Sequence, residues 1–346
     1  MINIGIIGCG KIAQTRHIPE YIDNKNCNIL GFYDRNKSRS DEMAKKYGGI
    51  SYDSYQDLLS DKNINAVSVC VTNNLHAEIT ITALRAGKHV LCEKPMATTI
   101  SDCKTMVKAA DENGRKLLIG HNQRLTPTHK KARELIRDGI IGDIITFRTT
   151  FGHGGPETWS IDSGPNVWFF NKKSAAIGAM ADLGIHKTDL IQFLTDDAIV
   201  ETTAKLVTLN KRNSAGELID VDDNAFCIYR TKRGIVGTMT ASWTFYGPED
   251  NSTILYGSKG IMRIYDDPDY SIKVLLNDGE KICFELDSIQ TNSNQTKSGV
   301  IDLFIDSILH DRETELSGKT ILSAMRVVFA SIESSREGKT IIIDRD

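Results

Sequence analysis

The sequence contains 346 residues, of which 40% are hydrophobic and 25% charged, and 42 basic and 45 acidic side chains give a formal net charge of -3 at pH 7. This composition is typical of a folded globular chain and excludes a disordered or collagen-like one, and the length allows two domains. The lack of a basic excess argues against nucleic acid as a partner. The sequence contains no run of about eighteen apolar residues, so no membrane span is predicted.

The amino terminus and the cysteines favour a cytoplasmic protein. Residues 1–7 lack the basic segment and the long apolar stretch of a secretory signal. The seven cysteines form no Cys-x-x-Cys pair, and most lie in apolar runs. We therefore expect buried thiols in a reducing compartment, rather than disulfides or a zinc site, and no bound metal.

From the amino terminus to about residue 120, short β-rich runs alternate with helical stretches. This alternation predicts an α/β domain whose doubly wound parallel sheet is covered by helices on both faces. Strands are expected at 2–7, 28–33, 50–52, 66–71, 89–92 and 117–119, and helices at 12–21, 37–47, 54–59, 77–86 and 101–113.

The second half of the chain has a different rhythm, because strand-like segments follow one another with few helices between them. Such a succession predicts an antiparallel meander. Its strands are expected at 204–208, 225–229, 236–242, 252–256, 260–265, 272–276 and 281–286, helices at 130–137, 181–194, 300–309 and 320–338, and a loop at 290–298. We therefore predict two domains, covering residues 1–122 and 123–346.

The segment after the first predicted strand, Gly8-Cys9-Gly10-Lys11-Ile12-Ala13, is a G-x-G-x-x-A sequence where a helix begins. Glycines let the backbone approach a pyrophosphate, and the helix amino terminus supplies free N–H donors. Asp34, at the end of the second predicted strand, can accept hydrogen bonds from a ribose diol. The segment predicts a dinucleotide site formed by Gly8, Gly10, Lys11, Ile12 and Asp34.

The residues at the end of the second strand also predict which dinucleotide binds. The Asp34 carboxylate repels a 2′-phosphate and therefore favours NAD. Arg35 beside it could accommodate that phosphate, so Arg35 is also a predicted cofactor-binding residue. We expect NAD as the cofactor, with NADP as the alternative.

Two further segments follow the predicted strands at 66–71 and 89–92. Thr72-Asn73-Asn74-Leu75-His76 follows one strand, and Glu93-Lys94-Pro95 follows the other. The carboxyl ends of parallel strands are where open α/β sheets bind ligands. Taken alone, Lys94 is as well explained as a surface lysine in a turn. Within this sheet we expect cofactor contacts from Thr72, Asn73, His76, Glu93 and Lys94.

These motifs, together with 87–95 and Asp182-Leu183-Gly184-Ile185-His186, resemble those of the Gfo/Idh/MocA oxidoreductase family over nearly the whole chain. The resemblance implies an amino-terminal Rossmann domain and a carboxyl-terminal α/β domain with a large, mostly antiparallel open sheet. Such sheets commonly form the oligomer interface, so a homodimer or homotetramer is expected. Members typically oxidise a secondary alcohol of a sugar or cyclitol, or reduce the matching ketone, with a nicotinamide cofactor.

By this resemblance, the catalytic residues are Lys94, Asp182 and His186. Asp182 and His186 are four residues apart, so on a helix they share one face, and the carboxylate can orient the imidazole. A base with a pKa near neutrality suits alcohol oxidation. We assign His186 as the principal acid/base, Lys94 as the cation that polarises the reacting oxygen, and Asp182 as the orienting group. The order in which His186 and Lys94 accept the proton is left open.

The predicted substrate site combines amide, imidazole and aromatic side chains, which suit the hydroxyls and the apolar faces of a sugar ring. Asp189 resembles a position at which inositol-type members bind a substrate hydroxyl. The other candidates come from segments 121–124 and 151–159 and from later aromatic residues, among which Trp168 and Trp243 are as readily core residues. The predicted substrate-binding residues are Asn122, Gln123, His153, Trp168, Asp189 and Tyr246.

Two departures from the family pattern leave the substrate open. Thr72-Asn73-Asn74 stands where the family usually has Thr-Pro-Asn, and residues 176–180 replace a glycine triplet. The leading interpretation is a dehydrogenase of a ring hydroxyl in a sugar, an inositol or a glycoside, with C3 of a glycoside as one possibility. An NAD-dependent glycosidase with transient C3 oxidation and a non-catalytic NAD(P)-binding sensor are the alternatives, and intact Lys94, Asp182 and His186 argue against the sensor.

Overall fold

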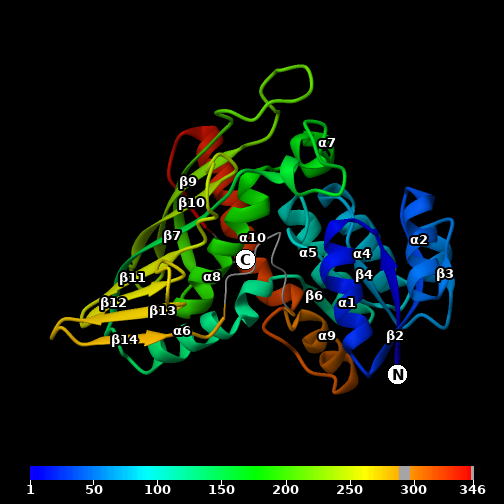
Figure 1. Ribbon diagram of the computed structural model, residues 1–346, viewed down its shortest axis with the longest axis horizontal. Helices are drawn as coiled ribbons and strands as arrows, with labels where there is room; N and C mark the ends of the chain where they lie inside the picture. Colours follow the sequence, from blue (N-terminus) through cyan, green and yellow to red (C-terminus); the bar gives the residue numbers. More distant parts are fainter. Residues whose placement is uncertain (288–296, 344–346) are drawn as a thin grey trace. The chain divides into compact units, whose positions relative to one another are not determined.

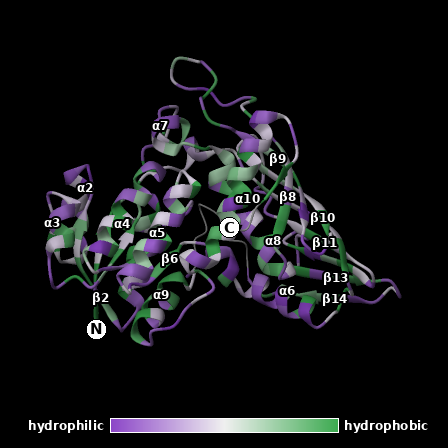
Figure 2. Cartoon of the chain, turned by 180° about the vertical axis from the view of Figure 1, so that it is seen from behind, coloured by the Kyte–Doolittle hydropathy of each residue, from purple (hydrophilic) through white to green (hydrophobic). Residues whose placement is uncertain are grey.

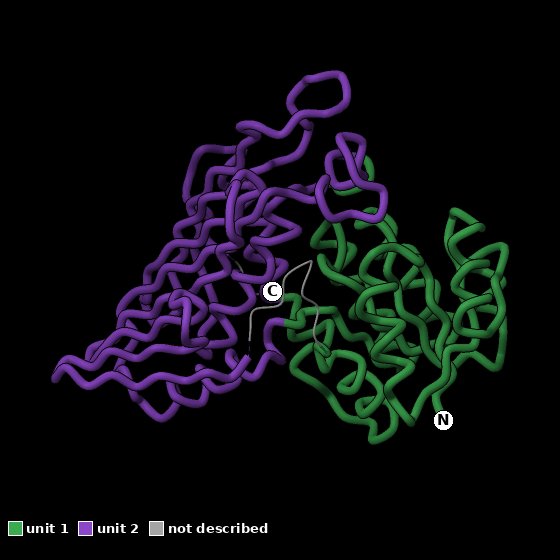
Figure 3. The backbone as a smooth tube through the Cα atoms, viewed as in Figure 1, with its two compact units in different colours: residues 1–122, 173–176, 295–322 green, residues 123–172, 177–294, 323–346 purple. Residues whose placement is uncertain are grey.

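The structure is a computed structural model that describes residues 1–287 and 297–343. The chain divides into two compact units, drawn in two colours in Figure 3. The first contains residues 1–122 and 173–176 and the described part of 295–322, and the second contains the other described residues. The predicted domains 1–122 and 123–346 stay a prediction, and segments 173–176 and 295–322 group with residues 1–122 in the first unit. Most of the loop predicted at 290–298 lies outside the described residues.

The later segment belongs to the first unit because its helix, α9 (Val300–Leu309), packs there. One face of α9 is apolar and buried, and the helix contacts α1 (Ile18–Asp23). Asn24 Nδ2 donates to Asp302 Oδ1 at 2.7 Å, and Ser298 N donates to Glu20 Oε1 at 2.7 Å. An amphipathic pattern predicts that a helix has a buried face, but not which unit covers it.

The first unit is built on a parallel sheet with the strand order β3-β2-β1-β4-β5-β6, formed by the blue and cyan part of the chain in Figure 1. The predicted doubly wound fold is therefore confirmed. The strands are β1 (Ile2–Ile7), β2 (Cys27–Tyr33), β3 (Ile50–Ser51), β4 (Ala66–Val69), β5 (His89–Cys92) and β6 (Leu117–Ile119). The order reverses between β1 and β4, and ligands bind such sheets beyond the carboxyl ends of the strands at this switch point.

The helices of the first unit present polar residues outward, as α2 shows in Figure 2, and only Ser40 and Met43 of α2 are buried. Among the few buried charges of this unit, Lys88 donates to the carbonyls of Asp61 and Ile64, both at 2.7 Å. All seven cysteines are unpaired, and Cys283 alone is exposed. Besides α1 and α9, the helices are η1 (Ala13–His17), α2 (Lys37–Tyr47), α3 (Tyr55–Ser60), η2 (Asn73–Leu75), α4 (His76–Arg85) and α5 (Ile100–Glu112).

The second unit is built on a nine-stranded, mostly antiparallel sheet with the order β14-β13-β12-β11-β7-β10-β9-β8-β15. Its helices are α6 (Pro127–Arg137), η6 (Met180–Gly184), α8 (Ile185–Thr195) and the part of α10 (Gly318–Glu337) from Ser323 onward. Its strands are β7 (Ile144–Gly152), β8 (Ile199–Val207), β9 (Asn224–Thr231), β10 (Val236–Ser242), β11 (Thr253–Gly257), β12 (Gly260–Ile264), β13 (Ile272–Leu276), β14 (Lys281–Phe284) and β15 (Ile341–Ile342).

Strand β7 was not predicted, and it changes the topology from a simple meander. It lies between β10 and β11, pairing parallel with the first and antiparallel with the second. Its alternation of Ile and Phe with Thr and an exposed Arg148 gives no continuous apolar run. Its position at the centre of the sheet depends on partners that lie more than eighty residues away, such as Thr238 opposite Arg148.

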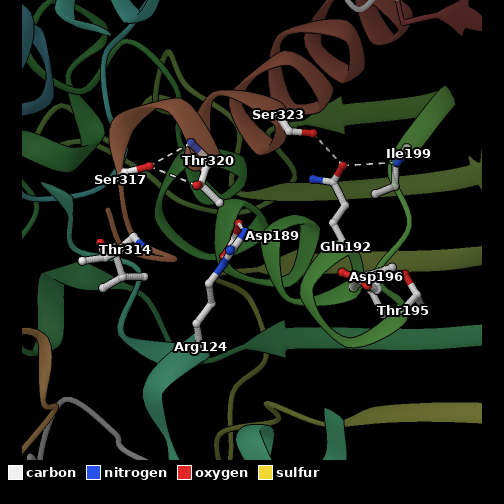
Figure 4. Close-up of polar contacts among 12 residues, drawn as sticks. Arg124, Asp189, Gln192, Thr195, Asp196, Ile199, Thr314, Ser317, Thr320 and Ser323 are labelled. Carbon is white, nitrogen blue, oxygen red and sulfur yellow. Dashed lines mark hydrogen bonds and ion pairs between the residues drawn. The ribbon is translucent and has the colours of Figure 1, made fainter. Parts of the chain in front are cut away.

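Helix α8 is buried at ten of its eleven residues, so its polar side chains need partners inside the protein. Gln192 supplies one such link, because its Oε1 accepts from Ser323 Oγ at 2.9 Å and from Ile199 N at 3.2 Å (Figure 4). These bonds connect α8 with α10 and β8. None of the described helices combines the length and hydropathy that a membrane crossing requires.

Candidate active site

The two glycines after β1 meet different constraints. Gly8 has a φ of 94°, and a Cβ there would lie 2.4 Å from Cys70 O, so the fold itself excludes any larger residue. A Cβ on Gly10 would meet no atom within 4 Å. Packing within the described chain therefore does not demand a glycine at position 10, whereas the close approach of a pyrophosphate does.

Asp34 follows β2 and is fixed against the glycine loop. Its Oδ2 accepts from Cys9 N at 2.7 Å, and its Oδ1 accepts from Asn36 N at 2.8 Å. Each carboxylate oxygen can accept a second hydrogen bond, so the group is oriented and still able to bind a ribose diol. Arg35 beside it is exposed, and Lys11 and Ile12 are partly buried at the start of the helix. These residues fit NAD.

Replacing Asp34 with alanine should weaken NAD binding by about tenfold or more and NADP binding much less, because the change removes a ribose acceptor and a charge that repels the 2′-phosphate. Fluorescence titration with both cofactors measures this. Asp34→Asn, which keeps one acceptor, should lie between, and Asp41→Ala on the exposed face of α2 is the control. An unchanged NAD/NADP ratio in Asp34→Ala would contradict the assignment.

The segment after β4 is held by its own polar side chains. Asn73 is buried and donates to Ala175 O at 3.0 Å, and Thr72 Oγ1 donates to Asn74 Oδ1 at 2.7 Å. The ring nitrogens of buried His76 lie 2.7 Å from Pro95 O and 3.1 Å from Val71 O. Burial lowers the pKa of His76, against the opposite effect of the hydrogen bonds to these two carbonyls. His76 thus connects the segments after β4 and β5, and its contact with the cofactor stays a prediction.

Glu93 of the Glu-Lys-Pro segment is buried and bonded to the protein on both oxygens. His17 Nε2 lies 2.8 Å from Oε1, and Lys94 N donates to Oε2 at 3.2 Å, while His17 Nδ1 lies 3.0 Å from Ser68 Oγ. Burial raises the pKa of Glu93, but the His17 hydrogen bond and the charges of His17, Arg16 and Lys94 outweigh burial and lower it to about 2.

Glu93 therefore has a positioning role for the backbone of Lys94, and its predicted contact with the cofactor stays a prediction. The histidine that supports it, His17, is the last residue of η1 and belongs to none of the predicted motifs. No local pattern could have found it, because seventy-six residues separate the two side chains.

Asp182 lies in the π-helical segment η6, and His186 lies in the first turn of α8; both are buried. Trp243 is fully buried and donates its indole N–H to Asp182 Oδ2 at 3.1 Å. The Phe151 ring centre lies 5.9 Å from that of His186. Single π-helical turns occur often at functional sites, since the wider turn redirects side chains. Of the two interpretations of Trp243, the structure supports the core residue, which also fixes Asp182.

The start of η6 is set by packing against the chain after residue 220. Gly178 N and Met180 N donate to the two oxygens of Asp222, both at 2.8 Å. A Cβ on Gly178 would lie 1.8 Å from Asp222 O, so only glycine fits there. This close approach explains the single glycine within residues 176–180.

Several predicted substrate residues lie among aromatic rings. His153 is buried, its Nδ1 accepts from Gly155 N at 3.0 Å, and its ring is 6.3 Å from that of Trp159. Partly buried Trp168 stacks on Phe169 with ring centres 3.8 Å apart. Tyr246 is 65% exposed, and its hydroxyl donates to Asn210 Oδ1 at 2.6 Å. Phe169 extends the aromatic surface beyond the predicted residues, and Trp159 belongs to the predicted segment 151–159.

Asp189 is held by a buried ion pair (Figure 4). Arg124 Nε donates to Asp189 Oδ2 at 2.7 Å, and Nη2 donates to Oδ1 at 2.5 Å. This bidentate ion pair is strong and has a specific geometry, and the Arg124 guanidinium compensates the charge of Asp189. Buried Gln123 donates to Asn251 Oδ1 at 3.4 Å, and Asn122 is the last residue of the first unit's initial segment. Substrate contacts by these residues stay predictions.

Lys187, next to His186, was missed by the sequence analysis. It has no solvent exposure, and its Nζ donates to Asn251 O at 2.7 Å and to Thr253 Oγ1 at 3.4 Å. Burial lowers its pKa to about 7, against the opposite effect of the Asp250 and Glu249 charges. Because α8 also contains polar residues such as Thr188 and Asp189, no apolar pattern distinguished Lys187 in the sequence.

Comparisons with known proteins agree on the nature of both units. A family model described as "Oxidoreductase family, NAD-binding Rossmann fold" matches residues 2–121, and the "GFO/IDH/MocA C-terminal domain" matches residues 129–263. An aldose-aldose oxidoreductase from Caulobacter crescentus, solved with glycerol, is 26% identical with a TM-score of 0.84 over 99% of both chains.

Curated relatives are also similar to this chain. Levoglucosan dehydrogenase of Pseudarthrobacter phenanthrenivorans is 30% identical over 63% of this chain, and the match spans 60% of that protein. Myo-inositol 2-dehydrogenase of Thermotoga maritima is 26% identical over 99% of both chains. D-glucoside 3-dehydrogenase of Escherichia coli is 30% identical over 56% of this chain and 54% of its own length.

Proposed function

Because this chain belongs to the Gfo/Idh/MocA family of oxidoreductases with an NAD-binding Rossmann fold, we propose that it oxidises a secondary ring hydroxyl of a sugar, glycoside or inositol with NAD, or reduces the matching ketone. The observation that carries this proposal is that Asp182, which accepts from Trp243, and His186 are both buried in a chain whose other unit has a glycine loop and Asp34 suited to NAD. Relatives named for levoglucosan, inositol and glucoside dehydrogenation support this substrate class.

Each of these residues has a separate role in the proposed reaction. Gly8, Gly10 and Asp34 would hold NAD, which in its oxidised form accepts a hydride from the carbon that bears the hydroxyl. His186 accepts the hydroxyl proton, and Asp182 favours the imidazolium that results. Lys94 donates a hydrogen bond to the same oxygen and stabilises the negative charge that develops on it. In ketone reduction His186 returns the proton.

The proposal is tested by following NADH formation across a panel of inositols, free sugars, sugar phosphates, nucleotide sugars and aryl glycosides, each repeated with NADP. Activity on one class, with NAD preferred, is the expected result. Oxidation at C3 is then read from the product of a glycoside. No activity on any member, with nicotinamide cofactor retained on the purified protein, would contradict the dehydrogenase proposal.

A homo-oligomer formed through the nine-stranded sheet is also part of the proposal. Phe226 and Ile228 of β9 and Val236 of β10 are 42%, 52% and 44% exposed. They lie on one face, because Ile228 pairs with Thr238 and Val236 pairs with Arg230. Contiguous exposed apolar side chains on a sheet are typical of a protein interface.

Replacing Phe226 and Ile228 with aspartate should convert a dimer or tetramer into a monomer, because two buried charges at an interface are not tolerated. Light scattering during gel filtration gives the mass. Ile145→Asp is the matched control, since Ile145 is 60% exposed and alternates to the opposite face of the sheet from Thr146, the partner of Val236. A double variant with the wild-type mass would contradict this interface.

A further inference from the structure

The segment between β10 and β11 is anchored at both ends to the helices that carry the catalytic pair. At its start, the Trp243 indole donates to Asp182 of η6. At its end, Lys187 of α8 donates to the carbonyl of Asn251 and to Thr253 Oγ1. The two ends of this segment are therefore bonded to the helical segments that contain Asp182 and His186.

Glu249 lies between the two anchors and is not used by the mechanism above. Its Oε1 is buried and has no hydrogen-bond partner within residues 1–287 and 297–343. Burial raises its pKa to about 7, opposed by the Lys187 charge and the Asn251 hydrogen bond and reinforced by the Asp182 charge.

Gln123 presents a second acceptor of the same kind. Its amide Nε2 donates to Asn251 Oδ1 at 3.4 Å, while its Oε1 is buried without a partner in the described part of the chain. The two acceptors thus flank one residue, Asn251. A buried acceptor without a donor destabilises the folded protein, and most such groups in native proteins are satisfied.

We propose that Glu249 and Gln123 form a subsite that accepts hydrogen bonds from substrate hydroxyls beside the carbon that is oxidised. The subsite selects polyols and sugars over monoalcohols, because its acceptors need two donors from one ligand. It rests on the proposed function and deepens it by assigning a specificity residue, Glu249, that no motif indicates. An oxygen that needs this hydrogen bond discriminates against a ligand that lacks the hydroxyl.

The test pairs a side chain with a substrate hydroxyl. The kcat and KM of wild type and Glu249→Gln are measured with myo-inositol, D-glucose and methyl β-D-glucopyranoside and with the monodeoxy analogues of each. We expect one analogue to lose about a hundredfold in kcat/KM with the wild type. Glu249→Gln should raise the KM of the parent substrate about tenfold or more and change kcat less than about threefold. With this variant, the same analogue should have a kcat/KM less than about threefold below that of its parent substrate.

Controls separate this subsite from folding and from the proposed function. Glu280→Gln, at the exposed turn between β13 and β14, should match the wild type, and all variants should bind NAD equally. If Glu249→Gln does not fold, Glu249→Asp should give the same raised KM. A deoxy penalty of equal size in wild type and variant overturns the subsite and leaves the proposed function intact. A wild type that turns over none of the wider panel overturns the proposed function.

Discussion

Replacing His186 with alanine should reduce kcat by at least about a hundredfold while leaving the Kd for NAD nearly unchanged. The imidazole is the proposed proton acceptor, and it lies in the second unit, whereas Gly8, Gly10 and Asp34 lie in the first. The loss should therefore appear in turnover and not in cofactor affinity. Steady-state kinetics and a fluorescence titration with NAD give the two quantities.

Lys94→Ala should show the same separation, since the ammonium stabilises charge that develops only as the hydroxyl loses its proton. The double variant should be little worse than either single variant, because both groups act on one oxygen. His310→Ala and Lys45→Ala, both at exposed positions, are the matched controls. Wild-type turnover in either His186→Ala or Lys94→Ala would overturn the assigned roles.

Glu93→Gln should lower the free energy of unfolding by about 3 kcal/mol at pH 7, because a pKa of about 2 in place of 4.5 stabilises the folded state. Because the pKa of Glu93 is lower in the folded state, the stability that it contributes falls as the pH falls. This stability is complete above pH 4.5, where the carboxylate is ionised in both states, and it is lost as the pH falls toward about 2. Urea unfolding of wild type and variant at a series of pH values measures the difference.

The difference between wild type and Glu93→Gln should therefore shrink toward zero as the pH falls to about 2. Glu112→Gln on the exposed side of α5 should differ little from wild type at every pH. Because Glu93 fixes the backbone of Lys94, its variant should also lower kcat. A stability difference that is independent of pH would show that the carboxylate is not held in its charged form by His17.

Most of the fold could be predicted because its elements follow local rules. Strands β1, β5 and β10 and helices α2 and α9 have the predicted bounds, since apolar periodicity and Gly or Asn stops are properties of adjacent residues. What failed was the arrangement in space. The centre of the second sheet is β7, whose alternating Thr residues give a weak signal, and α9 packs in the first unit although it follows β14 in the chain.

Only some residues of the candidate site could be predicted from the sequence. Gly8, Asp34, Lys94, Asp182 and His186 belong to short motifs and could be found from sequence. The groups that hold them, such as His17 under Glu93 and Trp243 beside Asp182, come from remote parts of the chain. Such partners are selected by the folded geometry, so only the structure could reveal them.

The buried lysines Lys187 and Lys88 can each report the unfolding of the unit that contains it. An amine without solvent exposure cannot be acylated in the folded protein, and Lys88, 6% exposed and bonded to two carbonyls, has the same protection in the first unit. Each becomes reactive only when its own surroundings open. Mass spectrometry of the two labelled peptides would therefore tell whether the units lose their structure together or one after the other.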